Sequence, residues 1–320
     1  MRIGFGAPVS GAWASPHNVG HFAERAEDLG YASLWTFHRL LTPADRESLD
    51  PVYRSVLDPL ITLAYAAART SRIRLGVSLI NFPFVTPVYL AKEAASLDVL
   101  SDGRFDLGLG AGWQREEFVA SGASQERRGA RAEEFVAALR TLWEDEVSEF
   151  DGEFYTIPPS RQFPKPVQKP HPPVLLGGVA EAALKRAGRI ADGWLSRSAT
   201  DLSRIHEQIA IVRRAAEEAG KDPESVRVVV RGVVRVGKEA RDDSGERLRL
   251  SGSYDQIQED TDWLAEQGVT ELFYDLNWDP LVGNPDAEPK SATARAEEIL
   301  EALAPSSRAD HSVSPKISSD

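Results

Sequence analysis

The chain has 320 residues, of which 42% are hydrophobic and 27% are charged, so it is long enough to bury one large core or two modest ones. Its formal net charge of −12 disfavours nonspecific attraction to nucleic acid or to anionic lipid. Cysteine is absent, which excludes structural disulfides, zinc–thiolate sites, iron–sulfur clusters and cysteine nucleophiles, and we expect a cytoplasmic protein. No stretch approaches the roughly 20 apolar residues that cross a bilayer, and the first residues predict a strand rather than a cleaved signal peptide.

Short β-rich runs alternate with longer amphipathic segments along the chain. The strand candidates are 2–7, 33–37, 73–80, 105–110, 173–177, 193–196, 226–236 and 270–276. The helical patterns are 19–29, 59–69, 88–100, 131–143, 180–190, 201–219, 256–267 and 294–303. This succession of β-then-α units with mostly apolar strands predicts an α/β fold, a closed parallel (β/α)8 TIM barrel, in preference to a doubly wound open sheet.

Two segments depart from this alternation. The proline-rich connection 144–172 predicts an irregular excursion over the surface before the fifth strand. Residues 305–320 are rich in serine and lack aromatic residues, which is typical of a disordered tail. We therefore expect one barrel domain over 1–304, followed by a C-terminal tail.

In such barrels the active site lies at the C-terminal ends of the strands, so the residues that directly follow each strand are the site candidates. His38 follows the second strand, where it serves either as a general acid–base group or as a structural hydrogen-bonding residue. Gly110, Gly112 and Trp113 follow the fourth strand, where the glycines allow close approach of either a ligand or another chain segment. Their spacing does not fit the GxGxxG fingerprint of dinucleotide-binding folds.

Two further segments are candidates for binding an anion. Gly177 and Gly178 lie between the fifth strand and a helix, so free amides at the helix start suit a phosphate, although a simple turn into the helix is the plainer interpretation. Arg128 and Arg131 belong to a basic cluster that either reaches an anionic ligand at the barrel mouth or forms a solvated helix face. The spacing of the histidines predicts no metal site.

Five stretches carry a more specific pattern. They are AEDLGYASLW (26–35), TSRIRLGVS (70–78), LDVLSDGRFDLGLGAGW (97–113), PVLLGG (173–178) and ADGW (191–194). In combination they resemble the luciferase-like family of flavin and deazaflavin oxidoreductases, a (β/α)8 barrel group. The match extends over nearly the whole chain, to about residue 303.

The resemblance implies a flavin-type ring in the barrel mouth, and the pattern is most similar to members that use coenzyme F420. In those members a non-proline cis peptide after the third strand lies behind the deazaflavin ring, and the matching bond is Ser78–Leu79. The phosphate-binding turn of the family corresponds to Gly177 and Gly178, and its glycine-rich loop corresponds to 110–113.

The active-site histidine of some members corresponds to His38. Several F420 relatives carry an acidic residue directly before it, whereas this chain has Phe37. Base-catalysed alcohol oxidation is therefore not transferred to this chain, and reduction of an enoyl or imine group fits at least as well. The leading hypothesis is an F420-dependent oxidoreductase that transfers hydride between C5 of the deazaflavin and a small organic substrate, with His38 or Glu117 as the proton partner.

Two alternatives stay open: an FMN-dependent luciferase-like monooxygenase, and a cofactor-binding protein without turnover. F420 bears a polyglutamyl tail, so basic residues along an exit groove, Arg127, Arg128 and Arg131, would favour it, whereas a short closed phosphate pocket would favour FMN. We expect a small-molecule substrate as the partner, with no nucleic acid and no membrane, and a homodimer stays open.

Overall fold

The computed structural model describes residues 1–45 and 49–305, and within them eight parallel strands close into a barrel in the order β1-β12-β9-β8-β7-β4-β3-β2. These strands are β1 (Arg2–Gly6), β2 (Ser33–Thr36), β3 (Arg74–Asn81), β4 (Phe105–Gly110), β7 (Val174–Gly177), β8 (Gly193–Leu195), β9 (Arg227–Val233) and β12 (Glu271–Asp275). Each one lies in a segment that the sequence predicts as a strand, apart from shifts of a residue or a few at the ends. The predicted (β/α)8 barrel is thus confirmed.

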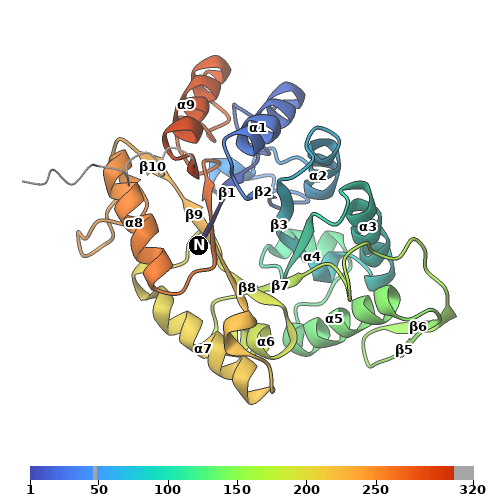
Figure 1. Cartoon of the computed structure of the whole chain (residues 1–320). Helices are drawn as coiled ribbons and strands as arrows, with labels where there is room; N and C mark the ends of the chain where they lie inside the picture. The colour runs from blue at the N-terminus through green and yellow to red at the C-terminus, as the bar shows by residue number, and fades with distance from the viewer. Residues whose placement is uncertain (46–48, 306–320) are drawn as a thin grey trace, which may run out of the picture.

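A ring of helices surrounds the strands (Figure 1). The helices are α1 (Pro16–Asp28), α2 (Pro59–Ala67), α3 (Pro87–Leu100), α4 (Arg115–Ala120), α5 (Arg128–Glu144), α6 (Glu181–Ile190), α7 (Ile205–Glu218), α8 (Tyr254–Glu266) and α9 (Pro289–Ala302). Ser15, Asp58 and Thr86 cap the first three of them, and a proline follows each cap. A side-chain acceptor followed by proline satisfies the first free amides and presets the helical backbone, so these helices begin at defined residues.

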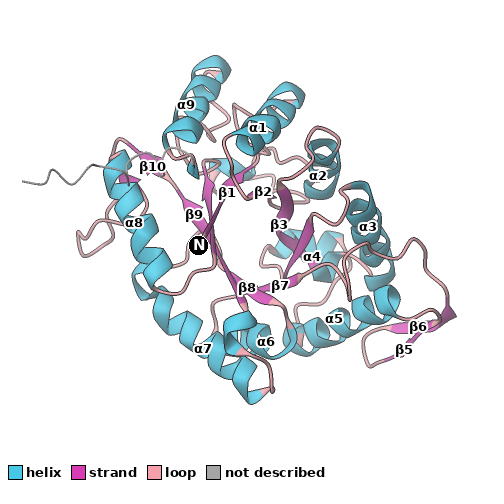
Figure 2. Ribbon diagram, in the orientation of Figure 1, coloured by secondary structure: helices cyan, strands magenta, loops and turns pink. Residues whose placement is uncertain are grey.

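The connection before the fifth barrel strand was predicted to be irregular, and this is wrong in part. It contains an antiparallel hairpin of β5 (Ser148–Asp151) and β6 (Thr156–Ser160), which Figure 2 shows beside α5 at the edge of the molecule. Pro158 and Pro159 lie within β6. They fall where the pairing with β5 shifts register, between Ile157 and Ser160. A strand tolerates proline at such a bulge, so the prolines disguise this strand in the sequence.

Two smaller elements also escape the sequence patterns. The predicted strand 226–236 ends as a barrel strand at Val233, and β10 (Arg235–Val236) then pairs with β11 (Ser251–Gly252) outside the barrel. Helix α4 is a six-residue segment, too short for a helical hydrophobic period to be recognised. The disordered tail was predicted for residues 305–320. Residues 306–320 lie outside the described part of the chain, so disorder there stays a prediction.

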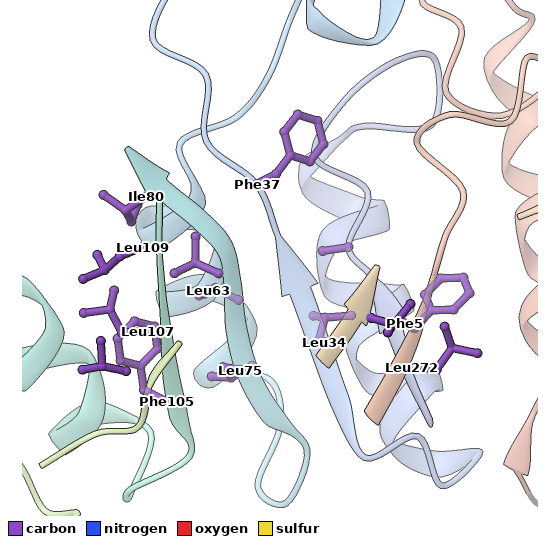
Figure 3. Close-up of a cluster of buried hydrophobic side chains, with 14 of the residues drawn as sticks. Phe5, Leu34, Phe37, Leu63, Leu75, Ile80, Phe105, Leu107, Leu109 and Leu272 are labelled. Carbon is purple, nitrogen blue, oxygen red and sulfur yellow. The ribbon is translucent and has the colours of Figure 1, made fainter. Parts of the chain in front are cut away.

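The barrel strands alternate between an outer apolar face and an inner face of mixed character. Phe105, Leu107 and Leu109 point to the same side of β4 (Figure 3) and belong to the core between strands and helices. The residues between them, Asp106 and Gly108, have the opposite orientation, as the period of two along a strand requires. On β4 the inner face therefore holds one charged residue and one glycine.

The floor of the barrel is an ion-pair network. Asp106 on β4 is completely buried and accepts hydrogen bonds from Arg74 on β3 (Nε–Oδ2 3.0 Å) and from Arg227 on β9 (Nη1–Oδ1 2.8 Å). Arg227 also reaches Glu271 on β12 (3.1 Å), and Arg2 on β1 pairs with the same carboxylate (2.8 Å). Burial alone raises the pKa of Asp106, but the two guanidinium groups outweigh it and hold this pKa below its usual value.

An apolar layer lies above this floor. It consists of the buried side chains Trp35, Leu175, Leu195, Val229 and Phe273. Trp35 and Phe273 stack with ring centroids 5.2 Å apart. Gly76 leaves room for the indole, because a Cβ at that position would lie 2.4 Å from the Trp35 ring. The layer fills the barrel interior between the floor network and the C-terminal ends of the described strands. No helix of the described ranges is long and apolar enough to span a bilayer.

Removing the Asp106 carboxylate should strongly destabilise the barrel. Asp106→Ala leaves two largely buried guanidinium groups without their main partner, which costs about 3–5 kcal/mol of unfolding free energy, measured by urea denaturation. Glu146→Gln is the matched control, because it breaks an exposed pair with Arg161 and should cost less than about 1 kcal/mol. Similar losses in the two variants would contradict a structural role for the floor network.

Candidate active site

The barrel mouth, meaning the C-terminal ends of the barrel strands and the loops that follow them, gathers most of the predicted site residues. The Ser78–Leu79 peptide bond in β3 is cis, as the resemblance implies, and the pairing of β3 with β4 shifts register between Val77 and Ile80. The side chain of Leu79 then lies against Gly110 and Gly177. A Cβ at Gly110 would lie 2.1 Å from Leu79 Cδ1, and a Cβ at Gly177 would lie 2.2 Å from Leu79 Cδ2. These two glycines accommodate Leu79.

The predicted loop after β4 is a compact unit. Gly112 has φ +68°, and a Cβ there would lie 3.0 Å from Phe84 and 3.1 Å from Phe118, so this position requires glycine. Arg128, at the start of α5, donates from Nη1 to the carbonyl oxygen of Gly112 (2.8 Å). Trp113, next in the chain, is 54% exposed. The guanidinium of Arg39 lies over its indole ring, with Cζ 4.7 Å from the ring centroid.

Glu117 is completely buried on α4. Its Oε2 accepts from Arg39 Nη1 (2.9 Å), and its Oε1 accepts from the main-chain N–H of Leu40 (2.8 Å). Both donors belong to the loop that follows β2 and carries His38. The carboxylate is therefore engaged in holding that loop, and its oxygens already have strong donors.

His38 itself has a defined hydrogen-bonding state. The main-chain N–H of Asn81 on β3 donates to its Nδ1 (3.2 Å). Because a backbone N–H can only donate, the proton of the neutral imidazole must lie on Nε2. Burial lowers the pKa of His38 to about 4, with Asp58 opposing this shift and Arg39 adding to it. At neutral pH the residue is an uncharged donor at Nε2.

The turn between β7 and α6 has the predicted free amides. Gly178 has φ +146°, and its carbonyl oxygen accepts from Trp194 Nε1 (2.8 Å). Among the described residues, no acceptor is found for the main-chain N–H groups of Gly178, Val179 and Ala180. These groups directly precede α6 and lie at its positive end, which is a suitable arrangement for an anion.

The basic cluster does not act as one surface. Arg127 pairs with Glu153 beyond β5, whereas Arg128 is tied to the β4 loop. Arg131 lies 4.5 Å from the centroid of Phe154 and lines a separate cavity of about 320 Å³ together with Tyr155. The structure thus joins Arg128 to the predicted loop but places Arg131 at a second cavity.

Sequence reasoning missed an ion pair in the mouth. Arg231 on β9 donates from Nε to Asp275 Oδ2 on β12 (2.6 Å), and both residues are buried. Trp278, whose ring lies 4.2 Å from Arg231 Cζ, also lines a cavity of about 580 Å³. A signal was present, because Arg231 interrupts an apolar run within 226–236, and a charge inside a barrel strand has to find a buried partner.

Acidification should destabilise the protein through His38. Because its native pKa of about 4 lies below the ordinary value, the unfolded chain binds a proton that the native imidazole does not. This contribution is complete above about pH 6.5 and is lost as the pH falls toward about 4. In urea unfolding at each pH, His38→Gln should lose about 3 kcal/mol less stability than the parent between these limits.

The glutamine keeps an acceptor for Asn81, so the variant removes the titration and not the hydrogen bond. His206→Gln, on the exposed part of α7, is the control and should follow the parent protein. A His38→Gln curve parallel to that of the parent would contradict a neutral, buried imidazole.

Comparison with known proteins identifies the family of the chain. The family described as luciferase-like monooxygenase matches residues 3–310. An uncharacterised protein of Mycobacterium tuberculosis is 33% identical over 295 residues, covering 88% of this chain and 92% of that protein. An F420-dependent glucose-6-phosphate dehydrogenase of Amycolatopsis mediterranei is 28% identical over 231 residues, covering 71% of this chain and 66% of that enzyme.

An FMNH2-dependent dimethylsulfone monooxygenase of Pseudomonas putida is 30% identical over 164 residues, covering 50% of this chain and 45% of that enzyme. Among solved structures, an F420-dependent secondary alcohol dehydrogenase superposes with a TM-score of 0.75 at 18% identity, over 95% of this chain and 99% of that one, which shows the shared fold. The chain therefore belongs to the luciferase-like monooxygenase family, whose relatives found here include both F420-dependent and FMN-dependent enzymes.

Proposed function

We propose that the protein is an F420-dependent oxidoreductase that transfers hydride between C5 of the deazaflavin and a small organic substrate in the barrel mouth. The observation that carries this proposal is His38, a neutral imidazole whose Nδ1 accepts from Asn81 at the end of β3 and whose proton therefore lies on Nε2. The similarity to an F420-dependent dehydrogenase, which extends over 71% of the chain, supports the deazaflavin. When bound, reduced F420 supplies the hydride.

The residues of the mouth fit such a cofactor. The main-chain N–H groups of Gly178, Val179 and Ala180 would hold the phosphate, since they donate to no acceptor among the described residues. The Ser78–Leu79 segment would support the ring system. The side chain of Leu79 fills the space that glycine leaves at positions 110 and 177, so the ring would rest against Leu79.

His38 favours reduction of the substrate over its oxidation. A general base for alcohol oxidation needs a free lone pair on Nε2, but in this tautomer Nε2 carries the proton and Nδ1 is occupied by Asn81. The Nε2–H group instead donates to the substrate atom that gains electron density. Phe37, which precedes His38, supplies no carboxylate that would change this state. We assign Glu117 to positioning, because its carboxylate holds Arg39 and Leu40.

An FMN-dependent monooxygenase is the second candidate. The similarity to an FMNH2-dependent enzyme at 30% identity over half of the chain favours it. The same amides would then hold the FMN phosphate, and the chemistry would require oxygen in place of an organic hydride acceptor. The choice depends on whether the protein recognises the anionic tail that F420 has and FMN lacks.

Parallel titrations with F420 and FMN test the cofactor. The parent protein should bind F420 more tightly, as followed by absorbance and fluorescence of the cofactor. If the tail of F420 extends from the mouth to the cavity of about 320 Å³ that Arg131 lines, Arg131→Gln should weaken F420 binding about 3- to 10-fold more than FMN binding at low salt, because one charge on a partly exposed site contributes about 1 kcal/mol. The difference should shrink near 1 M salt.

Arg161→Gln removes an equal charge from the exposed pair with Glu146 and is the matched control. Equal losses for both cofactors in Arg131→Gln would argue against recognition of the tail. Tighter binding of FMN by the parent would move the assignment to the monooxygenase.

Replacing His38 should separate binding from turnover. His38→Ala removes the Nε2–H donor, which the amide of a glutamine would replace. It should leave F420 affinity within about twofold but slow single-turnover reduction by on the order of 10²–10³, the usual contribution of one positioned hydrogen-bond donor to a developing oxyanion. Stopped-flow absorbance of the reduced cofactor measures this rate against a panel of enones and imines. Unchanged turnover would return His38 to a structural role, and cofactor binding without any turnover would indicate a carrier protein.

A further inference from the structure

The cavity of about 580 Å³ at the barrel mouth has a charged wall that the proposed function does not use. It is enclosed by the loop after β2, by β10 and the residues that follow it, by the loop after β12 and by α9. Its volume falls in the range of about 300–1,000 Å³ that is usual for small-molecule sites. Apolar surface comes from Val52, Val236 and Trp278. The ionisable side chains of the lining are Asp50, Arg235, Lys238, Glu239, Asp279 and Arg295.

Two carboxylates of this wall are already paired. Asp279 is 1% exposed, and its Oδ2 accepts from Arg295 Nη2 (3.1 Å), which also donates to the carbonyl oxygen of Val236 (2.7 Å). Glu239 pairs with Arg241, a residue that does not line the cavity. These pairs join the segments of the wall to one another. They leave no net charge for a ligand.

Arg235 and Lys238 keep their charges free. Within residues 1–45 and 49–305 neither side chain has a hydrogen bond or an ion pair. Asp50, the remaining carboxylate of the described lining, accepts from the main-chain N–H of Val52 (3.1 Å). It offsets one of the two cations, so the described wall keeps one net positive charge. The whole chain carries −12, and a wall of the opposite sign attracts an anion.

The main chain that carries these two cations is held in place. β10 pairs with β11, and β11 directly follows residues that the buried carboxylate of Asp260 on α8 fixes. Asp260 accepts from Arg247 Nη1 (2.7 Å) and from the main-chain N–H of Leu250 (2.7 Å). Because the segment is already ordered, a ligand that binds at Arg235 and Lys238 loses less of its binding free energy to ordering the chain.

The cavity lies on the substrate side of the mouth. The ring of Trp278 lies 5.2 Å from that of Phe37, the residue before His38. The turn proposed for the phosphate follows β7, and β8 and β9 lie between β7 and β12 in the barrel. The cavity that Arg131 lines belongs to the segments after β3 and β4. The cavity at Trp278 is therefore separate from both proposed cofactor contacts.

We infer that this cavity binds the carboxylate of a substrate with an apolar skeleton, so that the acid group contacts Arg235 and Lys238 and the skeleton lies along Trp278. The inference rests on the proposed function and specifies its substrate class. A guanidinium matches a carboxylate with two parallel hydrogen bonds, and an ammonium adds a point charge. The acid group takes no part in the hydride transfer. It holds the substrate in position while another part of the molecule reacts.

The charge of the wall favours a carboxylate over a phosphate group. A carboxylate carries one negative charge, which matches the net charge left by Arg235, Lys238 and Asp50. A phosphate monoester carries about −1.5 to −2 near pH 7, so its excess charge would face Asp50 in a protein of net charge −12. An uncharged group would leave both cations without a counterion.

Three probes with one carbon skeleton test the cavity on the full chain. Hexanoate carries the carboxylate, hexan-1-ol is uncharged and hexyl phosphate carries the larger charge; ligand-observed NMR titrations at low salt give the three affinities. The parent should bind hexanoate most tightly. Arg235→Gln should weaken hexanoate binding about tenfold, the usual effect of losing a charge-assisted contact, and Lys238→Gln about threefold, because its charge is more exposed. Binding of hexan-1-ol should change less than about twofold in either variant.

Arg214→Gln is the matched control, because it removes an equal charge from an exposed position on α7 and should change none of these affinities. Since neither cation of the cavity has a described partner to lose, both test variants should keep the melting temperature of the parent. Equal losses of hexanoate and hexan-1-ol, no binding of hexanoate by the parent, or tighter binding of hexyl phosphate overturns the inference. Displacement of hexanoate by F420 would assign the cavity to the cofactor tail and also overturn it. Binding of hexanoate that depends on Arg235, in a parent that does not bind F420, would overturn the proposed function alone.

Discussion

The buried carboxylate of Asp106 links strands on opposite sides of the barrel, and the other ion pairs and the apolar layer of the interior lie on or above this link. It pairs with Arg74 on the neighbouring strand and with Arg227 across the interior. Arg227 and Glu271 recur four residues later on the same two strands as Arg231 and Asp275. Every second residue of these strands faces inward, so Val229 and Phe273 lie between the two ion pairs and belong to the apolar layer. The floor stabilises the barrel, whereas in the upper pair Nη2 of Arg231 has no acceptor among the described residues.

The barrel could be predicted from the sequence because its signals are local. Apolar runs of strand period and amphipathic runs of helical period lie within a few residues of the boundaries that they define. The β5–β6 hairpin could not be predicted, since Pro158 and Pro159 are compatible with a strand only at the register shift between Ile157 and Ser160. That condition is set by the tertiary structure and leaves no trace in a short window of sequence.

The site was predictable only where family motifs or strand ends mark it. The cis bond at Ser78–Leu79 follows from the resemblance, and His38 follows from its place after a strand. The role of Gly177 required the structure, because its neighbour Leu79 is almost a hundred residues distant. Arg231 was missed for the same reason: its partners Asp275 and Ser78 come from strands that only barrel closure brings together.

The contact between Glu117 and the loop after β2 limits how this barrel can be altered. Loops at the mouths of such barrels are often regarded as exchangeable units on a constant scaffold. Here the Glu117 carboxylate on α4 accepts hydrogen bonds from Arg39 and Leu40. The loops after β2 and β4 are therefore bound to each other and depend on each other for their conformation. An exchange of either loop alone would bury an unpaired charge. Variation in substrate preference among relatives should therefore involve both loops together.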